Sequence, residues 1–271
     1  MNNHYVVNFD PVIFSLGPLQ VRWYGMMYVV GFVLAGFLVK HLGRKGFFKP
    51  GPDKSDSLIT HVLIGMFIGA RIFYVFIYNW DYYSENITDL FAVWKGGLSF
   101  HGALAGLLTS GYIFARRNKI SWAQTMDTIA LAGAPGLFFG RMGNFINGEL
   151  YGRTTDAAIG MIFPNGGPYP RHPSQLYEGI LEGIVLSIIL WVISKRVKTY
   201  GWIGATFMVG YGFFRYIVEF FREADSQLGY YFGGTTTMGQ ILCFVMIILG
   251  FAAYYVVWKK KWLMENEPFT S

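Results

Sequence analysis

Residues 238–258 read MGQILCFVMIILGFAAYYVVW, a stretch without a charged side chain that is long enough to cross the hydrocarbon core of a bilayer as a helix. The whole chain has the same character. Of its 271 residues 53% are hydrophobic and only 14% are charged, and the mean hydropathy is +0.36. Soluble domains usually carry about a quarter charged residues. The composition therefore predicts an integral membrane protein.

Seven apolar segments are candidate membrane spans: residues 23–40, 58–78, 98–115, 126–140, 175–194, 201–220 and 238–258. The fourth is short and contains Gly133, Pro135 and Gly136, so we expect it to be broken or tilted. The expected fold is an all-α integral membrane protein with about seven transmembrane helices. We expect residues 1–271 to form a single polytopic membrane domain.

The distribution of basic residues predicts the orientation. The segments that follow the odd-numbered spans carry Lys40, Arg44, Lys45, Lys49, Lys54, Arg116, Arg117, Lys119, Lys195, Arg196, Lys198, Lys259, Lys260 and Lys261. The opposite side carries Arg22, Lys95, Arg141, Arg153, Arg171 and Arg222. By the positive-inside rule the N-terminus is external (periplasmic) and the C-terminus cytoplasmic. This placement also accounts for the net charge of +6 without a nucleic-acid partner.

The run GRMGNFINGELYG, Gly140–Gly152, places Arg141, Asn144, Asn147 and Glu149 among four glycines at the end of an apolar segment. Charged and amide side chains there are costly if they stay unpaired in hydrocarbon. The run predicts a polar pocket at the external face of the membrane, with residues 141–174 as a small external head. The alternative is a polar loop that only turns the chain around.

Two further polar positions lie at the external ends of predicted spans. Tyr24 begins the first span, where a tyrosine can be an interfacial anchor. His101 stands in GGLSFHG, Gly96–Gly102, where a helix N-terminus favours the neutral imidazole and allows it to act as a base. The alternative for His101 is a structural histidine that is bonded to a neighbour.

The motif RHPSQLYE, residues 171–178, enters the fifth span. Ser174 can cap the helix. Glu178 is harder to explain as a cap, because Glu182 follows four residues later on the same apolar helix.

The motif GYGFFRYIVEFFREAD, residues 210–225, places Arg215, Glu219 and Arg222 on one helix face. Within an apolar helix these side chains must pair or face a cavity, and a purely structural ion pair is the alternative. Arg141 and Arg215, with Arg71 as an outside candidate, have the planar fork that suits phosphate oxygens. Cys243 is the only cysteine, so no intramolecular disulfide can form, and we expect it to be a small buried hydrophobe.

These motifs resemble those of the prolipoprotein diacylglyceryl transferases of bacterial inner membranes. The resemblance covers nearly the whole chain: FDPVIFSLGP, WYG, GARIFYV, GGLSFHGALAG, GRMGNFINGE, RHPSQLYE, YGFFRYIVEFFREAD and MGQIL. It implies transfer of a diacylglyceryl group from phosphatidylglycerol to the lipobox cysteine of a preprolipoprotein, with a thioether formed and glycerol 1-phosphate released. It implies no metal and no cofactor.

The resemblance also implies the functional residues. Those it marks by position are Tyr24, His101, Arg141, Asn144, Glu149, Gly152, Arg215 and Glu219, with Asn147, Glu178 and Arg222 carried over as well. Catalytic roles fall to His101 as the base and to Tyr24, Arg141 and Arg215. The others would bind or orient the substrate, with Glu219 orienting Arg215 and Glu149 orienting Arg141. A glutamate in place of His101 as the base is the alternative.

Two other classes of protein compete with the transferase. A small transporter would distribute charged residues along the bilayer depth and often show repeated halves. A lipid-binding subunit without turnover would not require His101 and the arginines to converge. The clustering of polar residues toward one face and the absence of a repeat favour the transferase.

Overall fold

The computed structural model describes residues 4–17, 19–92, 94, 96–223, 230–231 and 236–260. Some residues used in the sequence analysis lie outside this part of the chain: Lys95, Lys261 and residues 224–225, which end the motif GYGFFRYIVEFFREAD. The described residues divide into two compact units. Unit 2 is Val39–Thr128, and unit 1 holds the described residues up to Leu38 and from Ile129 onward. The chain passes between the units within α1 (Trp23–Arg44) and α5 (Trp122–Ile146).

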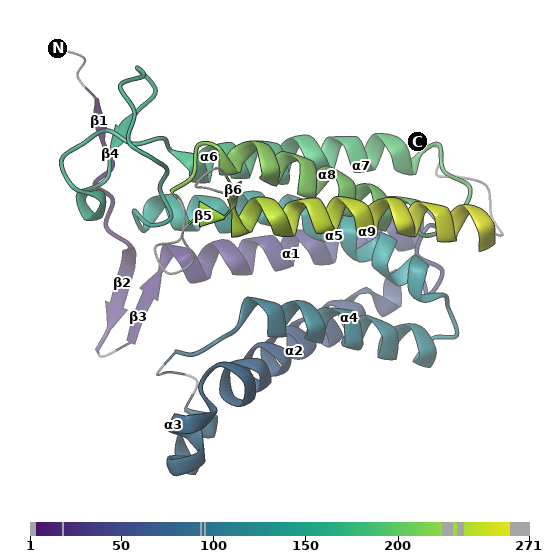
Figure 1. Ribbon diagram of the computed structural model, residues 1–271. Helices are drawn as coiled ribbons and strands as arrows, with labels where there is room; N and C mark the ends of the chain where they lie inside the picture. Colours follow the sequence, from purple (N-terminus) through teal and green to yellow (C-terminus); the bar gives the residue numbers. More distant parts are fainter. Residues whose placement is uncertain are drawn as a thin grey trace. The chain divides into compact units, whose positions relative to one another are not determined.

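Most of the described chain is helical, and a helix overlaps each predicted span (Figure 1). Besides α1 and α5, these are α2 (Ser55–Phe73) with the π-helix η2 (Tyr74–Tyr78), α4 (Phe100–Arg117), α6 (Ser174–Glu178) with the π-helix η6 (Gly179–Val185) and α7 (Leu186–Ser194), α8 (Trp202–Glu219) and α9 (Met238–Lys260). Within the described residues, four helical stretches are long and apolar enough to cross a membrane: Trp23–Arg44, Pro52–Tyr78, Ser174–Ser194 and Met238–Lys260. The fold is thus that of an all-α membrane protein.

Of the two expectations for the fourth span, the break is wrong, and the tilt stays a prediction. Helix α5 runs without interruption from Trp122 to Ile146, with Pro135 inside it. Gly133 and Gly136 both keep negative φ angles, so neither opens the helix. Gly136 faces Gly31 of α1, where a Cβ added at Gly31 would lie 3.5 Å from the Gly136 Cα, an ordinary contact distance. Arg141 and Asn144 therefore project from a helix, and the connecting segment that was predicted to start at residue 141 begins after Ile146.

Unit 2 is built on close packing of α2 against α4. Both helices carry a small-xxx-small pair, Gly65 with Gly69 and Gly102 with Gly106, which allows helix backbones to approach each other. A Cβ at Gly102 would lie 2.6 Å from the Phe73 Cβ and 2.9 Å from the Ala70 Cα. Four hydrophobic side chains are buried toward the end of the unit at which α1 and α4 finish in arginines: Leu42, Phe48, Leu58 and Phe114. The shorter elements of unit 2 are η1 (Pro52–Lys54), α3 (Trp80–Glu85) and η3 (Ile87–Phe91).

Gly106→Ala is expected to destabilise the protein by about 1–3 kcal/mol, because the added methyl overpacks a backbone-to-backbone contact. A Cβ at Gly106 would lie 2.7 Å from the Gly65 carbonyl carbon and 3.2 Å from the Gly69 Cα. Gly133→Ala is the matched control, since a Cβ there meets nothing within 4 Å. Thermal unfolding in detergent, followed by circular dichroism, measures both. Equal midpoints for the two variants would contradict the packing role of Gly106.

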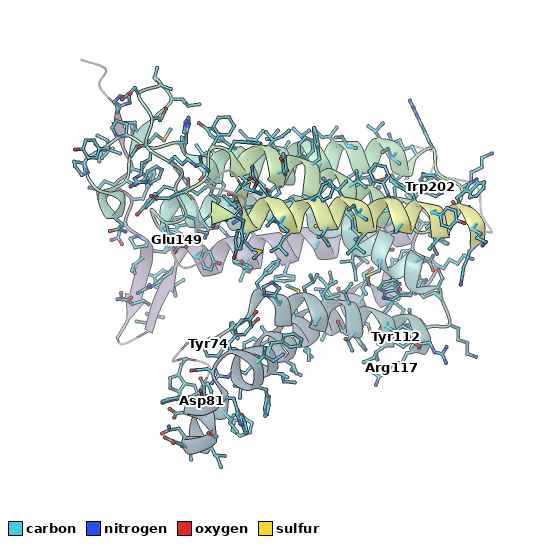
Figure 2. All side chains as sticks on the ribbon, in the orientation of Figure 1. Tyr74, Asp81, Tyr112, Arg117, Glu149 and Trp202 are labelled. Atoms are coloured by element: carbon cyan, nitrogen blue, oxygen red, sulfur yellow. The ribbon has the colours of Figure 1, made fainter. Side chains whose placement is uncertain are left out.

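Unit 1 groups α8 with α9, and α8 with the helix formed by α6, η6 and α7 (Figure 1). Figure 2 shows Glu149 at one end of this unit and Trp202 at the other. At the Glu149 end, β1 (Tyr5–Val6) pairs in parallel with β4 (Met161–Ile162) over a small core of Val7, Phe145 and Phe163. The hairpin of β2 (Val12–Leu16) and β3 (Leu19–Arg22) leads into α1. The remaining elements are η5 (Pro164–Gly166), β5 (Tyr230–Tyr231) and β6 (Thr236–Thr237).

Candidate functional site

Glu178 is the centre of the candidate site in unit 1. Its Oε2 lies 2.6 Å from Arg141 Nε, and its Oε1 lies 2.9 Å from Arg215 Nη1 and 4.0 Å from Arg222 Nε. The carboxylate is 1% exposed, so it can stay charged only through these partners. With Glu182 and Glu219 these residues form the arginine–glutamate network: Arg141, Glu178, Glu182, Arg215, Glu219 and Arg222.

Helix packing brings α5 close to Glu178. Gly183 lies against the α5 backbone, where a Cβ would come within 2.6 Å of the Phe138 N. Gly179 lies beside Arg141 and the Phe138 ring. Both glycines belong to the π-helix η6, and single π-turns of this kind are frequent at functional sites. The glycines let Arg141 reach across to Glu178 from the neighbouring helix.

Helix α8 supplies the second arginine. Arg215 Nη2 lies 3.1 Å from Glu219 Oε2, which confirms the predicted i, i+4 pair. The prediction of one helix face for all three charges is wrong for Arg222. The helix ends at Glu219, and Arg222 follows in the next turn, where it still approaches Glu178.

The arginines of the network lie on its accessible side. The side chains of Arg141, Arg215 and Arg222 are 23%, 11% and 16% exposed. The carboxylates lie beneath them, with Glu178, Glu182 and Glu219 between 0% and 5% exposed. Buried anions orient the guanidinium groups and leave part of each one available. This arrangement suits the binding of an anion with several oxygen acceptors.

The beginning of α9 supports Glu219 through residues that the sequence interpretation missed. Thr237 Oγ1 donates a hydrogen bond to Glu219 Oε1 at 2.9 Å. Gly239 leaves room for the carboxylate, since a Cβ there would lie 2.5 Å from Glu219 Oε1. Gly239 is part of the quoted MGQIL motif, but no feature of the sequence indicates that Thr237 faces Glu219.

Glu149 orients two asparagine side chains, whereas the family resemblance implied that it orients Arg141. Its Oε1 accepts hydrogen bonds from Asn144 Nδ2 at 2.9 Å and from Asn147 Nδ2 at 3.2 Å. The predicted pairing with Arg141 is wrong, because α5 continues past Arg141 and directs that guanidinium toward Glu178.

The RHPSQLYE motif holds the turn after α5. Ser174 is not the predicted N-cap, because Pro173 occupies that position, and Ser174 Oγ instead donates to the Leu150 carbonyl at 2.9 Å. Gln175 Nε2 donates to the Glu149 carbonyl at 2.7 Å. Leu150 has a φ of +57°, which is unfavourable for a side chain of this size. The two hydrogen bonds hold that strained turn in place.

Gly152 joins three segments at a crowded point. Its N–H donates to the His172 carbonyl at 2.8 Å, and a Cβ would come within 2.8 Å of the His172 Cβ. Gly152 also forms a bridge to Arg222, beside the hydrogen bond from the Arg153 N–H to the Phe221 carbonyl. Partial burial lowers the pKa of His172, which favours its neutral form. Gly152 therefore contributes the absence of a Cβ, which lets its backbone lie close to His172, and its bridge connects Arg222 to the GELYG turn.

Tyr24 packs on the polar end of α5. A Cβ at Gly143 would lie 3.0 Å from the Tyr24 Cδ2, so this glycine of GRMGNF accommodates the tyrosine ring. The Tyr24 hydroxyl lies 3.1 Å from the Tyr28 hydroxyl. Arg141 and Glu149 are within electrostatic reach of Tyr24.

Unit 2 contains His101, the predicted base. It is the second residue of α4, whose N-cap Ser99 accepts a hydrogen bond from the Gly102 N–H. The predicted position near a helix N-terminus is therefore confirmed. His101 Nδ1 is hydrogen-bonded to the Tyr78 hydroxyl at 2.8 Å. Tyr78 is the last residue of the π-helix η2 and was not singled out in the sequence.

Arg71, the outside candidate for a phosphate ligand, binds backbone carbonyls. Its guanidinium donates to the carbonyls of Asp89, Leu90, Gly96 and Gly97 at distances between 2.7 and 3.1 Å. The Tyr83 ring lies 5.2 Å away as a cation–π partner. The side chain is committed to holding the segment between α3 and α4.

Fold and site together define a polytopic helical membrane protein with a buried arginine–glutamate network and partly accessible cations. The sequence model of the prolipoprotein diacylglyceryl transferase family matches residues 11–256, and the chain belongs to that family. It is 49% identical over 245 residues to the phosphatidylglycerol–prolipoprotein diacylglyceryl transferase of Nitratidesulfovibrio vulgaris strain DP4, covering 89% of this chain and 92% of the relative. The proteins of the same name from Geobacter sulfurreducens and Pasteurella multocida are 48% and 49% identical. Both alignments cover 93% of this chain, with 96% and 95% of the relatives.

Proposed function

We propose that this chain transfers the diacylglyceryl group of phosphatidylglycerol to the lipobox cysteine of a preprolipoprotein, with a thioether formed and glycerol 1-phosphate released. The names of the curated relatives state the lipid donor and the prolipoprotein acceptor. The observation that carries the proposal is the arginine–glutamate network, in which Arg141 and Arg215 share Glu178 and keep accessible guanidinium surface. A phosphodiester is the part of the lipid that such a pair recognises.

The chemistry requires stabilisation of a leaving phosphate. The cysteine sulfur attacks a glycerol carbon, the bond from that carbon to the phosphate oxygen breaks, and the electron pair stays on the phosphate. Arg141 and Arg215 bind the oxygens on which charge grows, and preoriented donors of this kind contribute strongly in a water-poor site. Glu178 and Glu219 hold the two guanidinium groups in position.

The remaining predicted residues have supporting roles in this proposal. A free cysteine thiol has a pKa of about 8.5, so a base is needed near neutral pH. His101 takes the thiol proton, with a glutamate as the alternative. Tyr24 and Asn144 donate hydrogen bonds to substrate oxygens, while Glu149 orients Asn144 and Asn147. Gly152 binds the backbone of Arg222, the third arginine of the network, and Arg222 helps to bind the substrate.

The proposed topology has seven spans, an external N-terminus and a cytoplasmic C-terminus in the bacterial inner membrane, with the network toward the periplasmic face. Basic residues at the ends of the odd-numbered spans support it. A protease-sensitive tag after Ser271 tests it: we expect cleavage in inverted vesicles and protection in intact spheroplasts. Cleavage in spheroplasts would contradict the orientation.

The activity is tested with the purified full chain in detergent, phosphatidylglycerol and a lipobox peptide that contains one cysteine. Release of glycerol phosphate and a diacylglyceryl mass gain on the peptide are measured in the same samples. A peptide with serine in place of the cysteine is the substrate control. A folded preparation that binds lipid but forms neither product would favour the lipid-binding or transport class.

Arg215→Lys is expected to lower turnover about 10²-fold, the loss typical of removing one preoriented donor. Lysine keeps the charge but cannot hold both Glu178 and a phosphate oxygen with a planar fork. The assay above, run at saturating lipid, measures the effect on turnover. Turnover close to that of the unmodified protein would assign Arg215 to a purely structural ion pair.

A further inference from the structure

Glu182 is a buried carboxylate that the proposed chemistry does not use. Its side chain is 0% exposed, and neither of its oxygens has a hydrogen-bond partner in the described part of the chain. The nearest ion-pair contact within the described residues is Arg141 Nη2 at 3.9 Å from Oε2. Glu178 lies within 3 Å of two arginines, and Glu219 has both Arg215 and Thr237. Glu182 is therefore the least compensated carboxylate of the network.

Groups from every neighbouring element face Glu182. Helix α5 contributes Arg141 and α6 contributes Glu178. The other charged and titratable groups within electrostatic reach are Tyr211 and Arg215 of α8, Arg222 beyond it, and Cys243 of α9. The nearest full charges of opposite sign are already engaged by Glu178 or Glu219.

The charge balance of the network changes when an anion binds. Its three arginines and three glutamates balance when all are ionised. A bound phosphodiester adds one negative charge in a region from which water is largely excluded. An uncompensated charge there is costly, and buried groups avoid the cost by neutralising. A proton on the least compensated carboxylate restores the balance.

We propose that Glu182 takes up one proton from water when the anionic phosphodiester of the lipid binds the arginine–glutamate network. The carboxyl is then a neutral acid in the lipid complex, and the proton is released when the phosphate product leaves. This inference rests on the proposed function, because it requires the lipid phosphate to occupy the network. Where Glu182 is ionised in the free protein, lipid affinity falls about tenfold per pH unit as pH rises.

The test measures proton uptake directly. Phosphatidylglycerol in mixed micelles is titrated into the full chain without peptide, in buffers of different ionisation enthalpy and across a pH series. The unmodified protein is expected to take up one proton per lipid at the higher pH values. Glu182→Gln, which imitates the neutral acid, is expected to take up none and to bind lipid with little pH dependence. Glu85→Gln, an exposed carboxyl of α3, is the matched control and should behave like the unmodified protein.

Two outcomes would overturn the inference: lipid binding without proton uptake, or unchanged uptake in Glu182→Gln. If that variant does not fold, infrared difference spectra of the unmodified protein decide the question. A dialkyl ether phosphatidylglycerol removes the ester carbonyl signal, so a new protonated-carboxyl band on binding supports the inference, and its absence refutes it. Arg141→Ala separates the two proposals. If lipid binding depends on Arg141 but no proton is taken up, only the role of Glu182 is refuted. If Arg141→Ala binds lipid as well as the unmodified protein does, the phosphate binds elsewhere and the proposed function of the network is refuted.

Discussion

Arg141→Ala is expected to abolish detectable diacylglyceryl transfer, with a loss of at least about 10²–10³-fold, while the protein remains folded in the membrane. The substitution removes a guanidinium that is 23% exposed and that would bind the leaving phosphate. Glu178 keeps Arg215 at 2.9 Å, so the buried carboxylate is not left without a cation. Glycerol phosphate release and peptide mass are the measured quantities.

The control for this prediction is Arg196→Ala. Arg196 is exposed, lies in the connection between α7 and α8, and forms no part of the arginine–glutamate network. We expect it to leave transfer unchanged. If Arg141→Ala turned over lipid as fast as Arg196→Ala, the phosphate-binding role of Arg141 would be refuted.

Glu178→Gln is expected to lower both stability and turnover. Breaking a buried ion pair by removal of one partner costs about 3–5 kcal/mol, because the remaining charges are left uncompensated. Here two arginines lose a charged partner at 2.6 and 2.9 Å. Denaturation in detergent, with the transfer assay on the same preparation, measures the two effects.

Glu182→Gln is the matched control for the stability measurement, since it lies one turn further along the same helix and is equally buried. Its carboxylate has no hydrogen-bond partner in the described residues, so its neutralisation is expected to leave stability unchanged or raise it. Equal destabilisation by the two substitutions would show that the ion pairs of Glu178 with Arg141 and Arg215 do not stabilise the protein.

Much of the site could be predicted from sequence because polar residues are conspicuous in apolar segments. Arg215 and Glu219 pair as their spacing predicts, since neighbours four apart on a helix meet whatever surrounds them. His101 lies at a helix start because Ser99, two residues earlier, caps α4. These relations are local, and local geometry follows from the order of residues.

Some wrong assignments concern contacts between distant segments, whereas the predicted break in the fourth span, the Ser174 cap and the helix face of Arg222 are errors of local structure. Glu149 is close to Arg141 in sequence, yet Arg141 pairs with Glu178 from another helix. Arg71, an outside candidate for a phosphate ligand, donates hydrogen bonds to four backbone carbonyls between α3 and α4. Pro135 and its flanking glycines predicted a broken or tilted helix, and the helix is not broken. A charged side chain can be recognised in sequence, whereas its partner depends on packing.

The sequence by itself determined the membrane class, the positions of the helices and the family, because apolar length and motif order can be read along one dimension. The tertiary structure alone decided that Glu178 is the shared partner of Arg141 and Arg215, and that Glu182 lies among them without a hydrogen bond. Both glutamates stand one turn apart on one apolar helix, and nothing in their spacing distinguishes them. They differ because the glycines of η6 bring α5 within reach of Glu178, and because α8 places Arg215 against the same carboxylate.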